Sequence, residues 1–299
     1  MKVPFTKMHG LGNDFIFVDV RESALPDPEG FSKKFGDRRF GIGADQILLV
    51  GKSKVGDLRM DIYNQDGSKV EMCGNGIRCF AKYVADRKFP EAAGKDVLNV
   101  ETMAGIIRPR RLADGRVEVD MGEPRLEGDV IPVKLPPRAE ASANVDGKST
   151  KLDGRVVSRE VQLAGETRRI TCVSMGNPHV ILFVKDVDAI PLEVVGPKIE
   201  TDPLFPRKTN VEFVEVLPQR DGSVVLKTRV WERGSGITLA CGTGACAVGV
   251  AAFLNQEAPR KSIVRLPGGD LAIEWRESDN RVYMTGPAEE VFSGSVEWH

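Results

Sequence analysis

The feature of this sequence that most limits its fold is an internal repeat. Four matched pairs of residues recur in the same order in the two halves, with a nearly constant spacing between the members of each pair. The pairs are Asn13 and Asn177, Gln46 and Asn210, Asn64 and Glu232, and Cys73 and Cys241. The separation along the chain between Asn13 and Asn177 equals that between Gln46 and Asn210 and is called here the short repeat interval. The separation between Asn64 and Glu232 equals that between Cys73 and Cys241, is slightly larger, and is called the long repeat interval. Because so regular an order is not expected by chance, the sequence predicts two copies of one domain.

The residues between these positions predict the structure of each copy. Short apolar stretches separated by glycine-rich turns indicate strands, which we expect in the first half at 3–8, 15–20, 47–50, 58–63, 97–102, 106–112 and 117–121. One helix should begin near Asn75 and end near Phe89, because Pro90 stops it. The predicted fold class is α+β, with two pseudo-symmetric strand-rich domains, each a mostly antiparallel sheet or barrel wrapped around a central helix.

A change in composition marks the expected domain boundary. Between Pro124 and Thr150 the chain is rich in proline and carries a cluster of Ser, Asn and Gly. We therefore assign residues 1–123, with the C-terminal tail 287–299, to the N-terminal domain, and residues 124–286 to the second. Such copies commonly pack about a pseudo-two-fold axis, which predicts an active site in the interdomain cleft. The segment 136–166 is assigned no function.

Bulk properties exclude several classes of partner. With 42 basic and 43 acidic residues, the chain offers no electrostatic reason to expect a nucleic acid or a membrane surface. It shows no signal peptide, and its apolar runs are too short to cross a bilayer. Five cysteines without a regular spacing fit a reducing compartment. We therefore expect a cytoplasmic protein.

Each repeated cysteine stands directly before a Gly-x-Gly motif. After Cys73 an amphipathic run begins at this motif. Cys73 precedes Gly74-Asn75-Gly76, and Cys241 precedes a matching Gly-Thr-Gly. This pattern predicts a cysteine at the N-terminus of a helix. There the helix dipole lowers the pKa of a thiol, and backbone N–H groups of the first turn bind anions.

Four roles are open to such a pair. The lack of a targeting segment disfavours a structural disulfide, the spacings to Cys79 and Cys246 disfavour zinc, and the lack of Cys-x-x-Cys disfavours a redox couple. The fourth role is acid–base chemistry, in which one sulfur removes a proton from one face of a carbon and the other delivers one to the opposite face. Backbone N–H groups that could stabilise the developing charge are those of Gly74, Asn75, Gly242 and Thr243.

Longer motifs resemble those of the diaminopimelate epimerase family and together cover nearly the whole chain. They are MHGLGNDF at 8–15, FGIGADQ at 40–46, Asn64 with DGS at 66–68, EMCGNG at 71–76, MGNPH at 175–179, TNVE at 209–212, WERG at 231–234 and ACGTG at 240–244. The resemblance implies an enzyme that interconverts LL- and meso-diaminopimelate for lysine and peptidoglycan synthesis. It also implies that no cofactor or metal is used, and that the enzyme is a homodimer.

The resemblance implies a role for each site residue. Cys73 and Cys241 form the acid–base pair, assisted by His179 and Glu232. The residues expected to bind substrate are Asn13, Gln46, Asn64, Gly74, Asn75, Asn177, Asn210, Glu232, Arg233, Gly242 and Thr243. Of these, the four asparagines at 13, 64, 177 and 210 and Arg233 are assigned to the distal amino-acid end, since amides, a guanidinium and a carboxylate suit a zwitterion.

The same residues are open to other interpretations. Without the resemblance, asparagines in turns indicate backbone caps, and Glu232 with Arg233 indicates a solvated ion pair. A proline racemase-like enzyme is disfavoured because its substrate lacks a distal zwitterion, and a phenazine-type isomerase because it lacks the cysteine pair. A redox-sensing binding protein would use a Cys73–Cys241 switch. One departure from the family is Ile237, where many members carry Glu, which leaves one contact at the pocket edge open.

Overall fold

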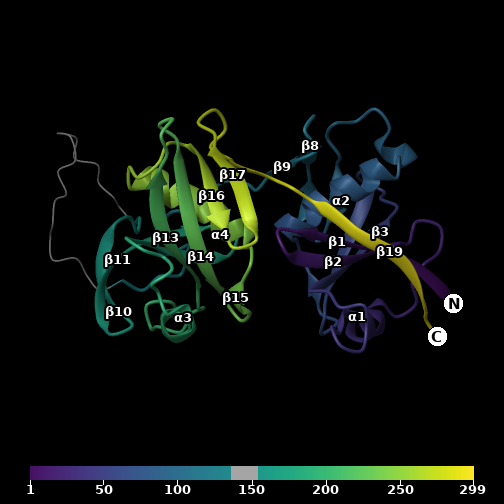
Figure 1. The fold of residues 1–299 in the computed structure, drawn as a ribbon, viewed down its shortest axis with the longest axis horizontal. Coiled ribbons are helices and arrows are strands. Elements are labelled where there is room, and N and C mark those ends of the chain that lie inside the picture. The colour runs from purple at the N-terminus through teal and green to yellow at the C-terminus, as the bar shows by residue number, and fades with distance from the viewer. Residues whose placement is uncertain (136–153) are drawn as a thin grey trace. The chain divides into compact units, whose positions relative to one another are not determined.

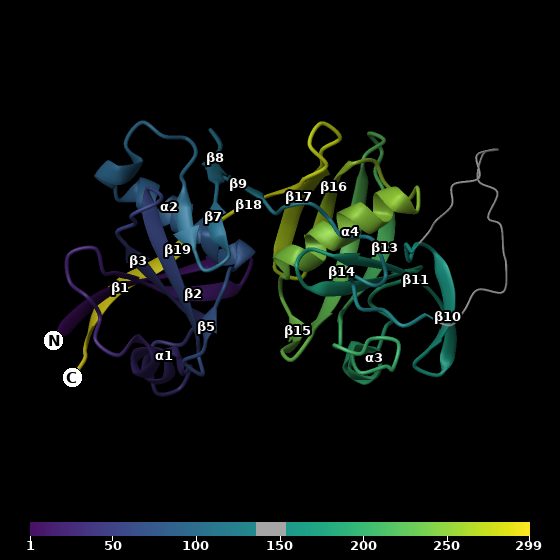
Figure 2. The same ribbon diagram turned by 180° about the vertical axis from the view of Figure 1, so that it is seen from behind.

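The structure is a computed structural model of the chain and describes residues 1–135 and 154–299. It divides into two compact units. The first unit comprises Met1–Asp120, Gly268–Asp270 and Tyr283–His299, and the second comprises Met121–Pro267 and Leu271–Val282. Figures 1 and 2 show that each unit combines many strands with few helices.

The first unit is built on a mixed sheet with strand order β19-β1-β2-β3-β4-β6-β7, and β5 pairs with β4. Its strands are β1 (Lys2–Gly10), β2 (Asn13–Asp19), β3 (Gln46–Gly51), β4 (Leu58–Asn64), β5 (Lys69–Val70), β6 (Val100–Thr102), β7 (Gly105–Ile107) and β19 (Glu289–Glu297). A smaller set pairs in the order β8 (Pro109–Arg111), β9 (Val117–Asp120) and β18 (Val282–Gly286). The helices are α1 (Pro28–Gly36), α2 (Gly74–Asp86) and the short 3-10 helix η1 (Pro90–Ala92).

Helices cover both faces of this sheet, which explains why its central strands are continuously apolar. Successive side chains of a strand point to opposite faces. Ile16 of β2 and Ile47 of β3 share a buried cluster with Phe31 of α1. The neighbouring Phe17 instead stacks on Tyr83 of α2, with ring centroids 5.1 Å apart. A strand covered on both faces needs apolar residues at every position rather than at alternate ones.

The second unit is built on a sheet with the order β10-β11-β12-β13-β14-β16-β17, and β15 pairs with β14. Its strands are β10 (Arg159–Leu163), β11 (Glu166–Ser174), β12 (Pro178–Val184), β13 (Asn210–Pro218), β14 (Val224–Glu232), β15 (Gly236–Thr238), β16 (Lys261–Leu266) and β17 (Gly269–Trp275). Its helices are α3 (Leu192–Glu200) and α4 (Gly242–Leu254). Because α4 is apolar on nearly every side, it is buried along most of its length against β11, β12 and β16.

The internal repeat is visible element by element. Helix α3 begins and ends at the short repeat interval after α1, and α4 begins and ends at the long repeat interval after α2. The parallel pair β2–β3 sets Phe15 opposite Gln46, and the parallel pair β12–β13 sets His179 opposite Asn210. His179 follows Phe15, and Asn210 follows Gln46, by the short repeat interval. The predicted class of two strand-rich, mostly antiparallel domains of repeated design is therefore confirmed.

The boundaries of three predicted elements within the first unit were wrong. The strand expected at 97–102 begins only at Val100, in β6. The helix expected to run to Phe89 ends at Asp86, because Lys88 adopts a left-handed φ of 52° that an α-helix cannot contain. The strand expected at 106–112 is divided at Arg108 into β7 and β8. Pro109, which has no N–H to donate to a ladder, begins the second piece.

Besides the central helix, each unit contains a second α-helix that was not predicted, α1 in the first unit and α3 in the second. The start of α1 carries a recognisable signal: Asp27 accepts a hydrogen bond from the N–H of Gly30 at 2.9 Å, and Pro28 occupies the first turn. Of the segment 136–166 that was assigned no function, residues 136–153 lie outside the described residues. Its end forms the whole of β10, the turn that follows and the first residue of β11.

Candidate active site

Both repeated cysteines cap the N-terminus of a helix in the same way. Cys73 precedes α2 with extended backbone (φ −136°, ψ 115°), and Cys241 precedes α4 with φ −117° and ψ 110°. Each sulfur accepts a hydrogen bond at 3.4 Å from the N–H three residues later, which belongs to Gly76 in α2 and to Gly244 in α4. An N-cap side chain that accepts from the third residue is how polar residues normally begin a helix, here with sulfur as the acceptor.

This placement gives each cysteine the same two chemical resources. The first-turn N–H groups of a helix have no acceptor within the helix and, with the helix dipole, attract anions. Gly74 and Gly242 are the first residues of their helices and directly follow the sulfurs. A carboxylate bound at either helix end would therefore lie beside a thiol, which is the arrangement needed to act on the carbon next to that carboxylate.

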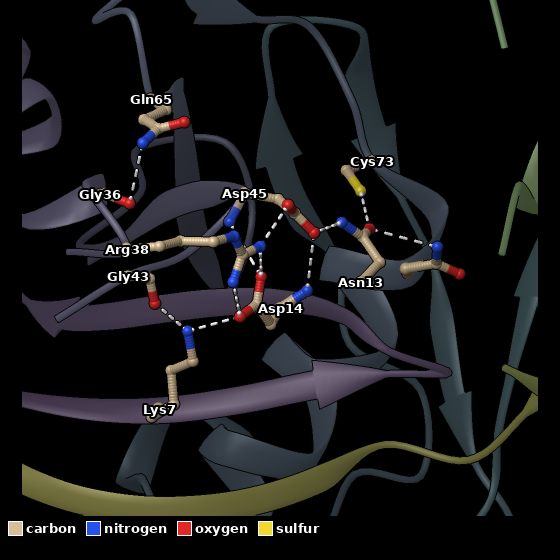
Figure 3. A network of polar contacts seen from close by, with 10 residues as sticks. Lys7, Asn13, Asp14, Gly36, Arg38, Gly43, Asp45, Gln65 and Cys73 are labelled. Carbon is tan, nitrogen blue, oxygen red and sulfur yellow. Dashed lines mark hydrogen bonds and ion pairs between the residues drawn. The ribbon is translucent and has the colours of Figure 1, made fainter. Parts of the chain in front are cut away.

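In the first unit, an asparagine lies against the sulfur. The thiol of Cys73 donates to Asn13 Oδ1 at 3.6 Å, and Nδ2 of Asn75 donates to the same oxygen at 3.2 Å. The other end of the Asn13 amide donates from Nδ2 to Asp45 Oδ2 at 2.8 Å. Figure 3 shows these contacts meeting at Asn13. Asn13 comes from the start of β2, so the turn between β1 and β2 positions it at the helix end.

Two further predicted residues meet at the ends of β3 and β4. Gln46 lies opposite Asn64 in the antiparallel pair, and Nε2 of Gln46 donates to Asn64 Oδ1 at 3.0 Å. Asn64 Nδ2 in turn donates to Ser68 Oγ at 3.0 Å. Gln46 Oε1 is buried and has no hydrogen-bond partner within residues 1–135 and 154–299. A buried acceptor without a donor is costly, so this oxygen is suited to receive a donor from a ligand.

The second unit carries a chain of polar contacts that ends at the other sulfur. His179 Nδ1 lies 2.7 Å from Glu212 Oε1, and both side chains are fully buried. His179 Nε2 lies 3.1 Å from Asn177 Oδ1, and Asn177 Nδ2 donates to Thr243 Oγ1 at 3.2 Å. Thr243 Oγ1 is 3.6 Å from Cys241 Sγ. The predicted residues Asn177, His179, Cys241 and Thr243 are therefore brought together, with Glu212 behind them.

Glu212 was not among the predicted site residues. Burial raises its pKa, and the charge and hydrogen bond of His179 act in the opposite direction. The pKa of Cys241 is raised well above its ordinary value by burial and by Glu232 and Glu212, against hydrogen bonds from Thr243 and the N–H of Gly244. For Cys241, burial and the two carboxylates therefore outweigh the lowering expected from the helix N-terminus, and they favour the thiol over the thiolate. The repeat could have identified Glu212, because Glu212 is equivalent to Leu48 at the short repeat interval and is a charged residue in an otherwise similar apolar strand.

The remaining predicted residues lie at one end of β13 and β14. Asn210 Oδ1 accepts from the backbone N–H of Arg233 at 2.8 Å, and its Nδ2 donates to the carbonyl of Pro178 at 2.9 Å. Thr238 Oγ1 donates to Glu232 Oε1 at 2.5 Å. The Arg233 guanidinium is exposed and donates to the carbonyl of Arg207 at 3.0 Å. Asn210 thus fixes the backbone that carries Arg233.

Ile237, the departure from the family pattern, lies on β15 opposite Trp231 and is 41 % exposed.

No helix within residues 1–135 and 154–299 is both long and apolar enough to span a membrane.

Solved structures of similar fold include a phenazine biosynthesis protein and a hydroxyproline epimerase. A phenazine biosynthesis protein of the PhzF family from Bacillus anthracis aligns over 100 % of both chains with a TM-score of 0.69 and 17 % identity. A hydroxyproline epimerase from Agrobacterium vitis aligns over 99 % of this chain and 92 % of its own with a TM-score of 0.61 and 14 % identity. At such identities the likeness concerns the fold.

Sequence comparison gives the family. The family model for diaminopimelate epimerase matches residues 5–127 and 171–291. The diaminopimelate epimerase 1 of Nostoc sp. is 50 % identical over 299 residues, covering 99 % of this chain and 100 % of its own. A chloroplastic diaminopimelate epimerase of Oryza sativa subsp. japonica is 51 % identical over 301 residues, covering 98 % of this chain and 79 % of its own. These relatives, together with the two cysteine-capped helices, define an isomerase of the epimerase class. The chain belongs to the diaminopimelate epimerase family.

Proposed function

We propose that this chain interconverts LL- and meso-diaminopimelate by proton transfer at one α-carbon, with Cys73 and Cys241 as the acid–base pair. The observation that carries the proposal is that each unit places a cysteine as the N-cap of its central helix with the same 3.4 Å contact to the first turn. Family membership supplies the substrate. The product is used in lysine and peptidoglycan synthesis.

The chemistry requires only groups that the two half-sites contain. One sulfur, as thiolate, takes the α-proton, so that a C–H bond breaks and an S–H bond forms. The other sulfur, as thiol, gives its proton to the opposite face of the same carbon, so that an S–H bond breaks and a new C–H bond forms. During the transfer the negative charge spreads onto the α-carboxylate. We assign the stabilisation of that charge to first-turn N–H groups, including those of Gly74 and Gly242, the first residues of their helices.

Both cysteines must reach one carbon in the complex, and a thiol with a raised pKa is suited to be the donor. Cys241 fits this role before substrate binds. Reversal of the reaction exchanges the two roles, so each cysteine serves as base for one stereoisomer. Glu232 raises the pKa of the Cys241 thiol, and His179 is connected to Cys241 through Asn177 and Thr243.

The distal amino-acid end of the substrate is assigned to the polar residues away from the sulfurs. Glu232 offers a carboxylate for the distal ammonium group, and Arg233 offers a guanidinium for the distal carboxylate. Gln46 Oε1 offers a buried acceptor, with Asn64 beside it. The contacts of Asn13 with Cys73 favour a place for Asn13 at the reacting end rather than at the distal end.

Three further parts of the proposal concern the whole enzyme. We expect a homodimer in the cytoplasm that acts without cofactor or metal. Light scattering of the purified protein tests the dimer. Adding pyridoxal phosphate, or treating the protein with a chelator, tests the cofactor independence, and a clear change in turnover would contradict it.

Proton exchange in D2O tests the central proposal. Reduced protein incubated separately with LL- and meso-diaminopimelate should place deuterium at the α-carbon and form the other isomer, as read by NMR and chiral chromatography. Proline and hydroxyproline serve as control substrates and should remain unlabelled. Absence of exchange from diaminopimelate, with intact thiols, would overturn the proposal. Mild oxidation should link Cys73 to Cys241 reversibly, since two sulfurs that serve one carbon can also bond.

A further inference from the structure

Two equivalent asparagines present opposite ends of their amides to the two helices. In the first unit Asn13 turns its oxygen to the helix, contacting Cys73 Sγ at 3.6 Å and Asn75 Nδ2 at 3.2 Å. In the second unit Asn177 turns its nitrogen to the helix, donating to Thr243 Oγ1 at 3.2 Å. Thr243 and Asn75 are equivalent, since each is the second residue of its helix. The two units therefore differ in which end of the equivalent asparagine amide faces the helix.

Asp45 is the cause of the orientation in the first unit. Its Oδ2 accepts from Asn13 Nδ2 at 2.8 Å and from the backbone N–H of Asp14 at 3.1 Å. An ionised carboxylate has acceptors and no donor, so only the nitrogen end of the Asn13 amide can face it. The amide oxygen is thereby directed to Cys73.

Asp45 is itself held in place by its other oxygen and its backbone. Arg38 Nη2 donates to Asp45 Oδ1 at 2.6 Å and also to Asp14, and the Asp45 N–H donates to Asp14 Oδ1 at 2.9 Å. Lys7 donates to Asp14 at 2.6 Å and to the carbonyl of Gly43. Burial alone would raise the pKa of Asp14, but the hydrogen bonds from Arg38 and Lys7 hold it well below its usual range. Figure 3 shows this cluster leading from Arg38 to Cys73.

The second unit lacks an aspartate at the corresponding place and orients its asparagine by a different residue. At the short repeat interval, Thr209 takes the place of Asp45 and His179 takes that of Phe15. His179 Nε2 lies 3.1 Å from Asn177 Oδ1, which leaves Asn177 Nδ2 for Thr243. Each unit thus uses one residue, different in kind, to select the direction of its asparagine.

We propose that Asp45 is a positioning residue that keeps the oxygen of Asn13, and not its nitrogen, against Cys73. The contact stabilises the protonated thiol relative to the thiolate, because a carbonyl oxygen accepts from S–H and repels S⁻. This inference rests on the proposed role of Cys73 in the reaction. Charged and titratable groups near Cys73 include Asp45, Asp14 and Arg38, which act through Asn13, and Arg78 and Cys79 on α2.

The substitution Asp45→Asn tests the inference because Arg38 has donors only. Charged Arg38 competes for the carbonyl of the new amide more strongly than the neutral N–H of Asp14, so the NH2 group should face Asn13 and Asn13 should turn its own oxygen toward it. The nitrogen of Asn13 then faces Cys73 and favours the thiolate. Asp45→Ala removes the acceptor without supplying a donor, so its effect should have the same direction and a smaller size. Asp114→Asn, in the exposed turn between β8 and β9, is the matched control.

Alkylation by iodoacetamide without substrate gives a readout that simple loosening would not produce. Mass spectrometry of the Cys73 peptide should show about fivefold faster alkylation at neutral pH in Asp45→Asn, and an unchanged rate at high pH where every thiol is ionised. Cys241 should change less than twofold in the same samples. The kinetic counterpart is a fall in kcat with little change in KM.

Two results would overturn the inference. One is an alkylation profile for Asp45→Asn and Asp45→Ala that matches the wild type. The other is a rise of equal factor at every pH, which would mean that the loop had opened and exposed the sulfur. Circular dichroism identifies a variant that fails to fold, in which case the remaining one decides. Since the alkylation needs no turnover, failure of the epimerase reaction itself would leave this test readable.

Discussion

Leu48 and Glu212 occupy the same place in the two units, each beneath the second glycine of the helix that a cysteine caps. A Cβ built at Gly76 would lie 3.1 Å from Leu48 Cδ2, and one at Gly244 would lie 2.7 Å from Glu212 Oε1. One cysteine-bearing helix therefore rests on an apolar side chain and the other on a buried carboxylate bonded to His179. The two half-sites share a backbone design but differ in charge.

This difference predicts unequal tolerance of alanine at the two glycines. In Gly244→Ala the new methyl group would collide with a carboxylate held by a buried hydrogen bond, and we expect a loss of about 2 kcal/mol in the free energy of unfolding. Gly76→Ala should cost about 1 kcal/mol or less, because the Leu48 methyl group can move aside. Urea denaturation measures both. Equal losses would contradict the proposed role of Glu212 as a fixed neighbour.

Removal of either repeated sulfur should end the reaction. Cys73→Ala and Cys241→Ala each lack one of the two groups that handle the proton, so epimerisation should fall by at least about a thousandfold while the fold is retained. Cys246→Ala, within the same helix α4 but away from its N-terminus, is the control and should keep most of its turnover. Substantial turnover by either active-site variant would refute the two-base mechanism.

Distal recognition should appear in KM more than in kcat. Arg233→Ala removes the guanidinium assigned to the distal carboxylate, and we expect KM to rise roughly tenfold to a hundredfold with a smaller change in kcat. Arg220→Ala, at an exposed turn between β13 and β14, should behave as the wild type. A KM for Arg233→Ala within twofold of the wild-type value would assign the distal end to other residues.

The lowered pKa of Asp14 should make the free energy of unfolding depend on pH. Its folded-state pKa lies well below its usual value, so its contribution is present above about pH 4 and is lost as the pH falls through the folded pKa. Asp14→Asn should therefore be less stable than the wild type by about 1–2 kcal/mol at pH 7, and the gap should narrow below pH 4. Urea denaturation across this range checks it, with Glu22→Gln, from an exposed pair with Lys52, as control. A gap that stays constant would contradict the assignment.

Local signals allowed much of this structure to be predicted. The repeat could be recognised because Asn13, Gln46 and Cys73 each have a counterpart at a nearly constant spacing. The helix N-termini followed from the Cys-Gly-x-Gly pattern, since an N-cap depends on residues within one turn. Such features require no knowledge of which distant segments meet.

The residues that were missed act through contacts between distant segments. Asp45 reaches Asn13 only because β2 and β3 run parallel with Phe15 opposite Gln46, a register that local sequence does not specify. In the sequence Glu212 is a single charged residue in an apolar strand, and only its contact with His179 in the folded chain identifies it as part of the site. The end of α2 depended on the left-handed backbone of Lys88, a residue type that seldom adopts it.

The strand β19 pairs along its whole length with β1, from Lys2 opposite Glu297 to His9 opposite Glu289. The sheet of the first unit is thus completed by a segment that the ribosome makes only after the second unit. During synthesis the first unit must wait with β1 as an open edge, whereas the second can fold earlier. A chaperone that shields exposed strand edges would therefore be needed by the half that is made first, and an affinity tag fused close to β19 would interfere with that same half.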